Sequence, residues 1–192
     1  GSNINLEPLA GLLALEQLEI SGQGSSSNAN ALEALTNIRR LSLDGLALVD
    51  VDFISTFRRL EYLTINNNRI ADLTFLRNLA RLREIDVRSN SLADLNDLVG
   101  LESLERINAS DNRISVVDEL RALPNLRSLN LERNRLRDLD AIGQMKRLEE
   151  LNVGSNRLDF LDGLEGASNL RWLDISDNIY IGDLSPLQAL GG

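Results

Sequence analysis

The sequence predicts an α/β fold of the solenoid type, with a parallel β-sheet on one side and short helical returns, 3-10 or α, on the opposite, convex side. All 35 positions expected to be apolar in residues 60–169 are apolar, and an asparagine returns at the ninth position of each repeat from residue 60 onward. The underlying period is 22 residues, with repeats that open at Leu60, Leu82, Leu104, Leu126, Leu148 and Leu170.

The first half of each repeat predicts a short strand. Apolar residues occupy the fourth and sixth positions, whereas the third, fifth and seventh positions are mostly polar. This alternation is typical of a strand with one buried face. Strands in a parallel sheet lie about 4.8 Å apart, so we expect residues 22 apart in the chain to become neighbours in one column of the sheet.

The second half of each repeat predicts a helical return, because its apolar residues recur at every third place. One such series is Leu92, Leu95, Leu98 and Leu101. We expect four aspartates to cap these returns, namely Asp72, Asp94, Asp138 and Asp183. We also expect the phenylalanines in the returns to pack on the convex side, namely Phe53, Phe57, Phe75 and Phe160.

The asparagine column has a structural interpretation. An inward asparagine amide can donate to and accept from the backbone of the turn, including that of the adjoining repeat, where strand pairing has ended. We therefore expect a structural asparagine ladder rather than a binding site. Its members are Asn68, Asn90, Asn112, Asn134, Asn156 and Asn178.

The repeat pattern divides one domain of about eight repeats into three parts. Residues 1–14 form an N-terminal half-repeat, in which Gly1 and Ser2 resemble an expression scar. Residues 15–37 form a degenerate first repeat, and its segment Ser21 to Asn30 is expected to be irregular or mobile because it is rich in glycine, serine and asparagine. Residues 38–190 follow the repeat well, with a one-residue insertion before Leu184.

With these leucines and asparagines the chain resembles the leucine-rich repeat family, and its repeat length is similar to that of the short, 22-residue class of SDS22-like and internalin-like proteins. The resemblance implies a leucine-rich-repeat solenoid in the form of a right-handed, curved horseshoe with a concave parallel β-sheet. It also implies a scaffold or adaptor that recognises a partner protein through this concave face. Similarity to SDS22-like proteins implies an intracellular adaptor or regulatory subunit. Similarity to internalins implies a bacterial surface adhesin.

The outward positions of the strands define the expected binding face. The third positions hold two aromatic residues, Tyr62 and Trp172, and the fifth positions form a stripe of short polar side chains. Position two alternates between glutamate and arginine from Glu16 to Arg171, which favours a ladder of ion pairs between neighbouring strands. The candidate partner-binding residues are Trp172, Tyr62, Glu150, Asp174, Asn152, Arg106, Glu84 and Asp86.

Trp172, the one tryptophan of the chain, is the leading candidate. Exposed aromatic side chains are enriched among the residues that dominate protein interfaces. The alternative is that its indole packs over the last strand and shields the edge of the sheet. Tyr62 is the second candidate, in the same column.

Charge and composition exclude several functions. The net charge is −9, from 29 acidic and 20 basic residues, which disfavours nucleic acid and mildly favours a basic or amphipathic protein or peptide partner. The chain contains neither cysteine nor histidine, so thiolate catalysis, imidazole acid–base catalysis and the usual zinc sites are excluded. We expect a protein that is not an enzyme and that has no catalytic residues, no cofactor and no metal.

Two questions stay open at this point. The alternative function is a structural or self-assembly module, or a fragment of a larger protein, that interacts through uncapped ends of the solenoid, with a homodimer formed through the edge strand near Trp172 to Ser176. The expected location is cytoplasmic, with a bacterial surface or secreted protein as the alternative. We expect no insertion into a membrane, since no apolar run approaches about 20 residues.

Overall fold

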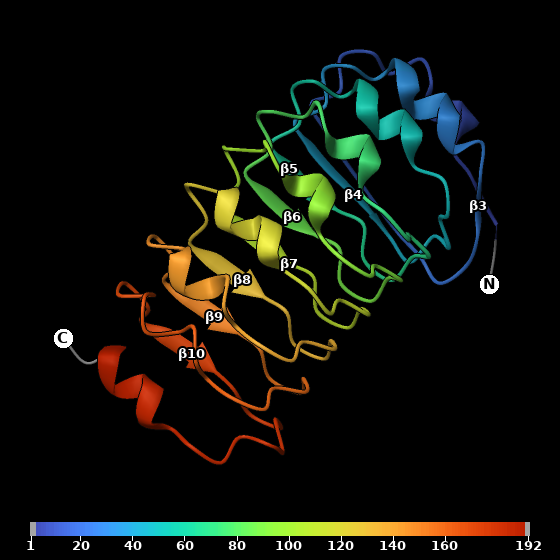
Figure 1. Ribbon diagram of the computed structural model, residues 1–192. Coiled ribbons are helices and arrows are strands. Elements are labelled where there is room, and N and C mark those ends of the chain that lie inside the picture. Colours follow the sequence, from blue (N-terminus) through green and yellow to red (C-terminus); the bar gives the residue numbers. More distant parts are fainter. Residues whose placement is uncertain (1–2, 191–192) are drawn as a thin grey trace.

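Eight parallel strands form one sheet along the concave side of the protein in a computed structural model, which describes residues 3–190 (Figure 1). Gly1 and Ser2, the expected scar, lie outside the described residues. The strands follow the order of the chain: β2 (Gln17–Ser21), β4 (Arg40–Asp44), β5 (Tyr62–Thr64), β6 (Glu84–Asp86), β7 (Arg106–Asn108), β8 (Ser128–Asn130), β9 (Glu150–Asn152) and β10 (Trp172–Asp174).

The register of the sheet places equivalent repeat positions side by side. Tyr62 pairs with Glu84, and Glu84 pairs with Arg106, so the third positions form one column from Gln17 to Trp172. The fifth positions form a second column, from Glu19 to Asp174. The predicted parallel sheet of stacked repeats is confirmed.

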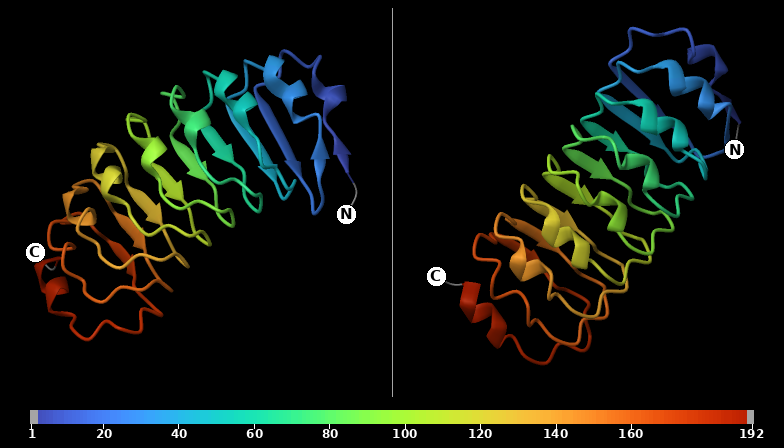
Figure 2. Two further views of the ribbon diagram at one scale, coloured as in Figure 1. Left: turned by 45° about the vertical axis from the view of Figure 1, so that its right-hand side comes forward. Right: turned by 45° about the horizontal axis from the view of Figure 1, so that its top comes forward.

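The returns opposite the sheet are short 3-10 helices (Figure 2). They are η1 (Glu7–Leu9), η2 (Ala29–Ala34), η3 (Asp52–Thr56), η4 (Thr74–Leu76), η5 (Asn96–Leu98), η6 (Asp118–Ala122), η7 (Ile142–Gln144) and η8 (Ser185–Leu190). The repeat that begins at Leu148 returns through turns instead. Asp72, Asp94 and Asp183 each accept a hydrogen bond from the backbone N–H two residues later, at 2.8 to 3.1 Å, as expected of capping residues. No such bond is found for Asp138 within residues 3–190.

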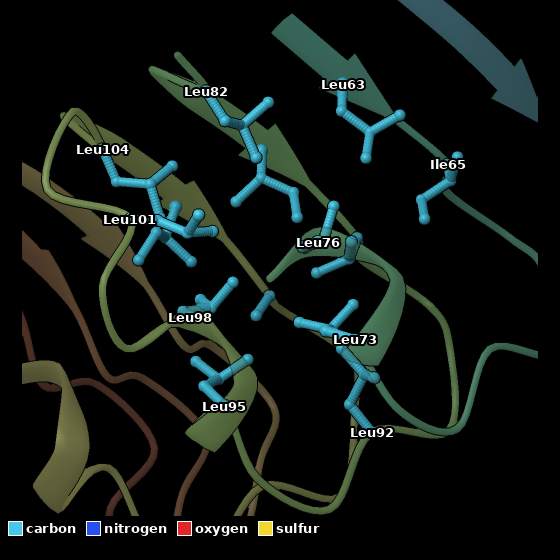
Figure 3. Packing of buried hydrophobic residues seen from close by; sticks show 14 of the residues in the cluster. Leu63, Ile65, Leu73, Leu76, Leu82, Leu92, Leu95, Leu98, Leu101 and Leu104 are labelled. Atoms are coloured by element: carbon cyan, nitrogen blue, oxygen red, sulfur yellow. The ribbon is translucent and has the colours of Figure 1, made fainter. Parts of the chain in front are cut away.

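The core is the space between the sheet and the returns. Strand residues such as Leu63 and Ile65 and return residues such as Leu73, Leu76 and Leu98 point toward one another there (Figure 3). Each of these five side chains is at most 1% exposed. Burial of each leucine contributes about 1.5 to 3 kcal/mol, so the repeated leucines are the main source of stability.

Each ladder asparagine joins its own turn to the preceding repeat. The Nδ2 of Asn112 donates to the carbonyls of Ala109 and Ser110 in its own turn, at 3.1 Å each, and to that of Val87 in the repeat before, also at 3.1 Å. Its Oδ1 accepts from the backbone N–H of Leu92, at 3.0 Å. The other five members make the equivalent bonds, and all six amides lie at the point where strand pairing ends.

The eighth position of the repeat turns the chain out of the strand through a left-handed backbone. From Gly45 to Asp177 this position has φ between 53° and 68° in seven successive repeats. A Cβ on Gly45 would lie 2.1 Å from the carbonyl oxygen of Gly22, so only glycine fits there. The later repeats place Asn67, Ser89, Asp111, Arg133, Ser155 and Asp177 in this conformation.

One expectation is corrected and one is refined. The segment from Ser21 to Asn30 consists largely of bends and irregular backbone, but it contains β3 (Ser26–Ser27), which pairs in parallel with β1 (Ile4–Asn5), and η2 begins at Ala29. Phe53, Phe57 and Phe75 are buried as expected, but Phe160 is 68% exposed, so the prediction that it packs on the convex side was wrong. Phe160 stands at the repeat position that holds a capping aspartate in η4 and η5, and that position faces solvent.

We predict that Asn112→Leu destabilises the protein by about 1 to 3 kcal/mol for each buried backbone group that it leaves unpaired. Urea unfolding followed by circular dichroism measures this change. The control is Asn78→Leu, because Asn78 is exposed on the convex side and lies outside the ladder. Equal unfolding midpoints for the two variants would contradict the role assigned to the ladder.

Candidate functional site

The candidate partner-binding residues form two groups on the concave face. Tyr62, Glu84, Asp86 and Arg106, on β5 to β7, are called the central cluster, and Glu150, Asn152, Trp172 and Asp174, on β9 and β10, are called the C-terminal cluster. Strand β8 separates the two groups. The structure therefore brings the eight candidates onto one surface but not into one site.

In the central cluster, Tyr62, Glu84 and Arg106 each interact with another side chain of the protein itself. The guanidinium of Arg40 lies 3.6 Å from the centre of the Tyr62 ring, so a basic side chain of the protein itself already covers this aromatic face. Arg106 lies 3.7 Å from the carboxylate of Glu84. A shallow groove of about 360 Å³, bordered by Glu19, Arg40, Tyr62 and Glu84, runs over these strands.

In the C-terminal cluster the aromatic side chain is more open. Trp172 is 50% exposed, and its partner in the register is Glu150. The Glu150 carboxylate accepts a hydrogen bond from the Ser128 hydroxyl at 2.8 Å, so it is held along the sheet. An apolar ring and a fixed carboxylate thus lie side by side at the end of the third-position column.

The fifth-position column has a structural role that the sequence analysis missed. From β6 to β10, the side-chain oxygens of Asp86, Asn108, Asn130, Asn152 and Asp174 each accept a hydrogen bond from the backbone N–H two residues later, at 2.9 to 3.3 Å. This local bond is a known property of aspartate and asparagine and explains why short polar residues recur there.

The fifth-position candidates differ in how much side-chain surface they offer to a partner. Asn152 is 9% exposed and offers a partner almost no surface. Asp174 is partly exposed, and hydrogen bonds from the hydroxyl and backbone N–H of Ser176 hold its pKa below the usual value. Asp174 is therefore a carboxylate at neutral pH beside Trp172.

The alternating charges at the second position form an exposed ladder of ion pairs. Arg39 lies 3.6 Å from Glu16 and 2.8 Å from Glu61, and Arg171 lies 3.3 Å from Glu149. Arg83 with Glu105 and Arg127 with Glu149 are further pairs. Exposed pairs of this kind each contribute about 0 to 1 kcal/mol, so their effect on stability is small.

A further hollow, of about 720 Å³, lies at the rim near the N-terminal repeats. Gly22, Gly24, Gly45 and Asp44 border it, and burial raises the pKa of the Asp44 carboxyl above its usual value. The backbone N–H of Asn66 donates to this carboxylate at 2.8 Å. Apart from the glycines and Ala47, the residues that line it are polar, and they include Gln23 and Arg69, so the hollow offers a partner no large apolar side chain.

Within residues 3–190 no group of three or more acidic side chains is placed to hold a metal ion. Over the same residues, no helix has the length and apolar character needed to cross a membrane.

Two family models match the chain. The model described as "Leucine Rich repeats (2 copies)" matches residues 58–100 and 102–144, and the model described as "Leucine rich repeat" matches residues 124–179. These matches cover more than half of the sequence. No match was found among the curated proteins.

Solved structures of similar fold come from bacteria and plants. Internalin C2 from Listeria monocytogenes has a TM-score of 0.83 and 23% identity, over 90% of this chain and 76% of its own. A leucine-rich repeat protein from Leptospira interrogans has a TM-score of 0.82 and 23% identity, over 95% of this chain and 54% of its own.

A plant receptor shares the fold over a shorter part of its length. The ectodomain of the receptor kinase GASSHO1/SCHENGEN3 from Arabidopsis thaliana, in complex with CASPARIAN STRIP INTEGRITY FACTOR 2, has a TM-score of 0.80 and 20% identity. The alignment covers 98% of this chain and 24% of the receptor chain. At these identities the likeness of all three structures concerns the fold alone.

Proposed function

Since the chain belongs to the leucine-rich repeat family, we propose that it is a non-enzymatic, cytoplasmic scaffold or adaptor that binds a partner protein on its concave face. A location on a bacterial surface is the alternative. The C-terminal cluster is the centre of the proposed binding surface. The remaining candidates, in the central cluster, serve as a secondary contact.

This proposal rests on the exposure of Trp172 to solvent. Its neighbours along the third-position column form pairs within the protein: Arg40 with Tyr62, Glu84 with Arg106 and Ser128 with Glu150. Trp172 follows the last of these pairs and is half exposed. A large rigid aromatic ring in water gains more from burial by a partner than any other side chain of the column.

The charge around Trp172 indicates the chemistry of the partner. Glu150 pairs with Trp172 in the register of the sheet, and Asp174 lies two residues further along β10. The second, third, fifth, seventh and eighth positions of the repeats together carry 13 acidic and 8 basic side chains, a net charge of −5. A segment that presents an apolar residue next to lysine or arginine complements this surface. Its association weakens as the salt concentration rises, since the charges are exposed.

The relatives support a protein or peptide partner. The GASSHO1/SCHENGEN3 ectodomain was solved in complex with CASPARIAN STRIP INTEGRITY FACTOR 2, and a second structure of this fold, the plant peptide hormone receptor RGFR1, was solved in complex with RGF2. The identity of the partner of this chain does not follow from them, because function on a repeat fold depends on the variable outward side chains.

A displayed library of random peptides tests the proposal, because it samples many candidate partner sequences at once. We expect the selected peptides to be rich in basic and apolar residues, and we expect Trp172→Ala to weaken their binding by about 30-fold, which corresponds to about 2 kcal/mol. Val116→Ala is the matched control, because Val116 is an exposed apolar residue on the convex side. Peptides that bind wild type and Trp172→Ala equally would contradict the proposed centre.

A second candidate function, self-assembly, is favoured by the free edge of β10. In every repeat from β5 to β9 the sixth-position N–H donates to the next repeat, as Val153 does to the carbonyl of Asp174 at 2.8 Å. The equivalent N–H of Ile175 makes no backbone hydrogen bond within residues 3–190, and the side chains of Leu173 and Ile175 are only partly buried. A second copy could add to this edge.

Light scattering over a concentration series distinguishes the two candidates. Assembly through the edge predicts a mass that rises with concentration and a return to monomer in Ile175→Lys, whose charge would have to be buried at the contact. A constant monomer mass for wild type would eliminate self-assembly and leave the concave face as the binding surface.

A further inference from the structure

The last return leaves the register of the solenoid. In the five preceding repeats the first apolar residue of the return is buried, as Leu139 and Leu161 are. The residue in that place after β10 is Leu184, one position late in the sequence, and it is 58% exposed. The last return therefore does not bury its first apolar residue as the preceding returns do.

A groove of about 260 Å³ lies between the last two repeats at this point. Phe160 and Leu161 belong to its wall from one repeat, and Tyr180, Gly182 and Pro186 belong to its wall from the next. Phe160 and Tyr180 are 68% and 63% exposed, so two aromatic rings at one groove present most of their surface to solvent. Neither ring contributes to the buried core.

The charged side chains that line the groove are all acidic. Asp159, Asp162 and Asp183 line it, and no lysine or arginine of residues 3–190 does. The backbone N–H and the hydroxyl of Ser185 donate to Asp183, at 2.8 and 2.7 Å, and these bonds hold its pKa below the usual value. The described part of the chain shows no ion pair for any of the three carboxylates.

We propose that this groove is a second binding site, separate from the concave face, that receives a lysine or arginine side chain of a partner protein. The aromatic faces attract a cation and cover its aliphatic stem, while the carboxylates accept hydrogen bonds from its charged end. An anionic side chain is repelled by the three aspartates. A purely apolar side chain would leave the carboxylates without a partner.

The groove differs from the concave face in whether the protein itself supplies a cation to the aromatic ring. On the concave face Arg40 occupies the face of Tyr62, so the protein supplies its own cation there. At the groove the aromatic rings and carboxylates are present, and the cation has to come from another molecule. The proposal does not depend on Trp172 and remains valid if the concave face binds nothing.

Capped tripeptides are the probes for the test. Ac-Gly-Lys-Gly-NH₂ and Ac-Gly-Arg-Gly-NH₂ carry the proposed side chains, Ac-Gly-Nle-Gly-NH₂ has an apolar chain of similar length, and Ac-Gly-Glu-Gly-NH₂ has the opposite charge. Titration into ¹⁵N-labelled protein, followed by NMR, maps the binding site and reports the fold of each variant. We expect the lysine and arginine probes to shift the amides of residues 159–163 and 180–185 and to bind more tightly than the norleucine and glutamate probes.

Variants of the groove and matched controls complete the test. Phe160→Ala and Asp162→Asn should each weaken binding of the lysine probe by about two- to fivefold. Val116→Ala, at the same repeat position as Phe160, and Asp118→Asn, an exposed carboxylate of another return, should leave binding unchanged. The proposal is wrong if norleucine binds as well as lysine, if the shifts spread over the acidic surface instead of this groove, or if groove and control variants bind alike.

Discussion

The structure depends on one constraint: a buried asparagine amide has to meet backbone groups from two successive repeats at once. Its Nδ2 reaches carbonyls of its own turn and of the preceding repeat, and its Oδ1 accepts an N–H of the preceding repeat, as Asn112 does with Val87 and Leu92. This set of bonds is possible only when consecutive turns lie directly beside each other. It therefore fixes the register in which leucines stack and strands pair, while leucine burial supplies most of the free energy.

Because of the same constraint, the residues that stabilise the fold point inward and those available to a partner point outward. Inward positions are held by packing and by the ladder, so the outward positions are free to vary, and neighbouring side chains in the third-position column interact mainly with each other. Arg40 covers Tyr62, and Glu84 meets Arg106. Surfaces for partners are therefore expected where such pairing stops. In this protein it stops in the last two repeats, at Trp172 on the concave face and at Phe160 and Tyr180 near the return.

The regular part of the fold could be predicted from the sequence because each position is repeated many times. The leucine spacing predicts the sheet, the returns and the columns, and inward asparagines such as Asn112 need a backbone partner in any packed repeat. The site is less predictable, since it depends on which outward side chains satisfy one another. The cover of Tyr62 by Arg40 and the bonds of the fifth-position residues to their own turns depend on side-chain conformation. Phe160 is exposed because its repeat position faces solvent in other repeats too, as at Val116, and its apolar side chain gave no sign of this.

Amide hydrogen exchange measured by NMR tests the central constraint most directly. The informative groups are the backbone N–H groups that donate to an asparagine of the next repeat, namely those of Ile70, Leu92, Ile114, Leu136 and Leu158. They lie outside the strands, and an asparagine Oδ1 is the one hydrogen-bond acceptor of each of these N–H groups within residues 3–190. If the ladder fixes the register, these amides exchange as slowly as those of the central strands and open only with global unfolding. Exchange at the rate of exposed turns would contradict it.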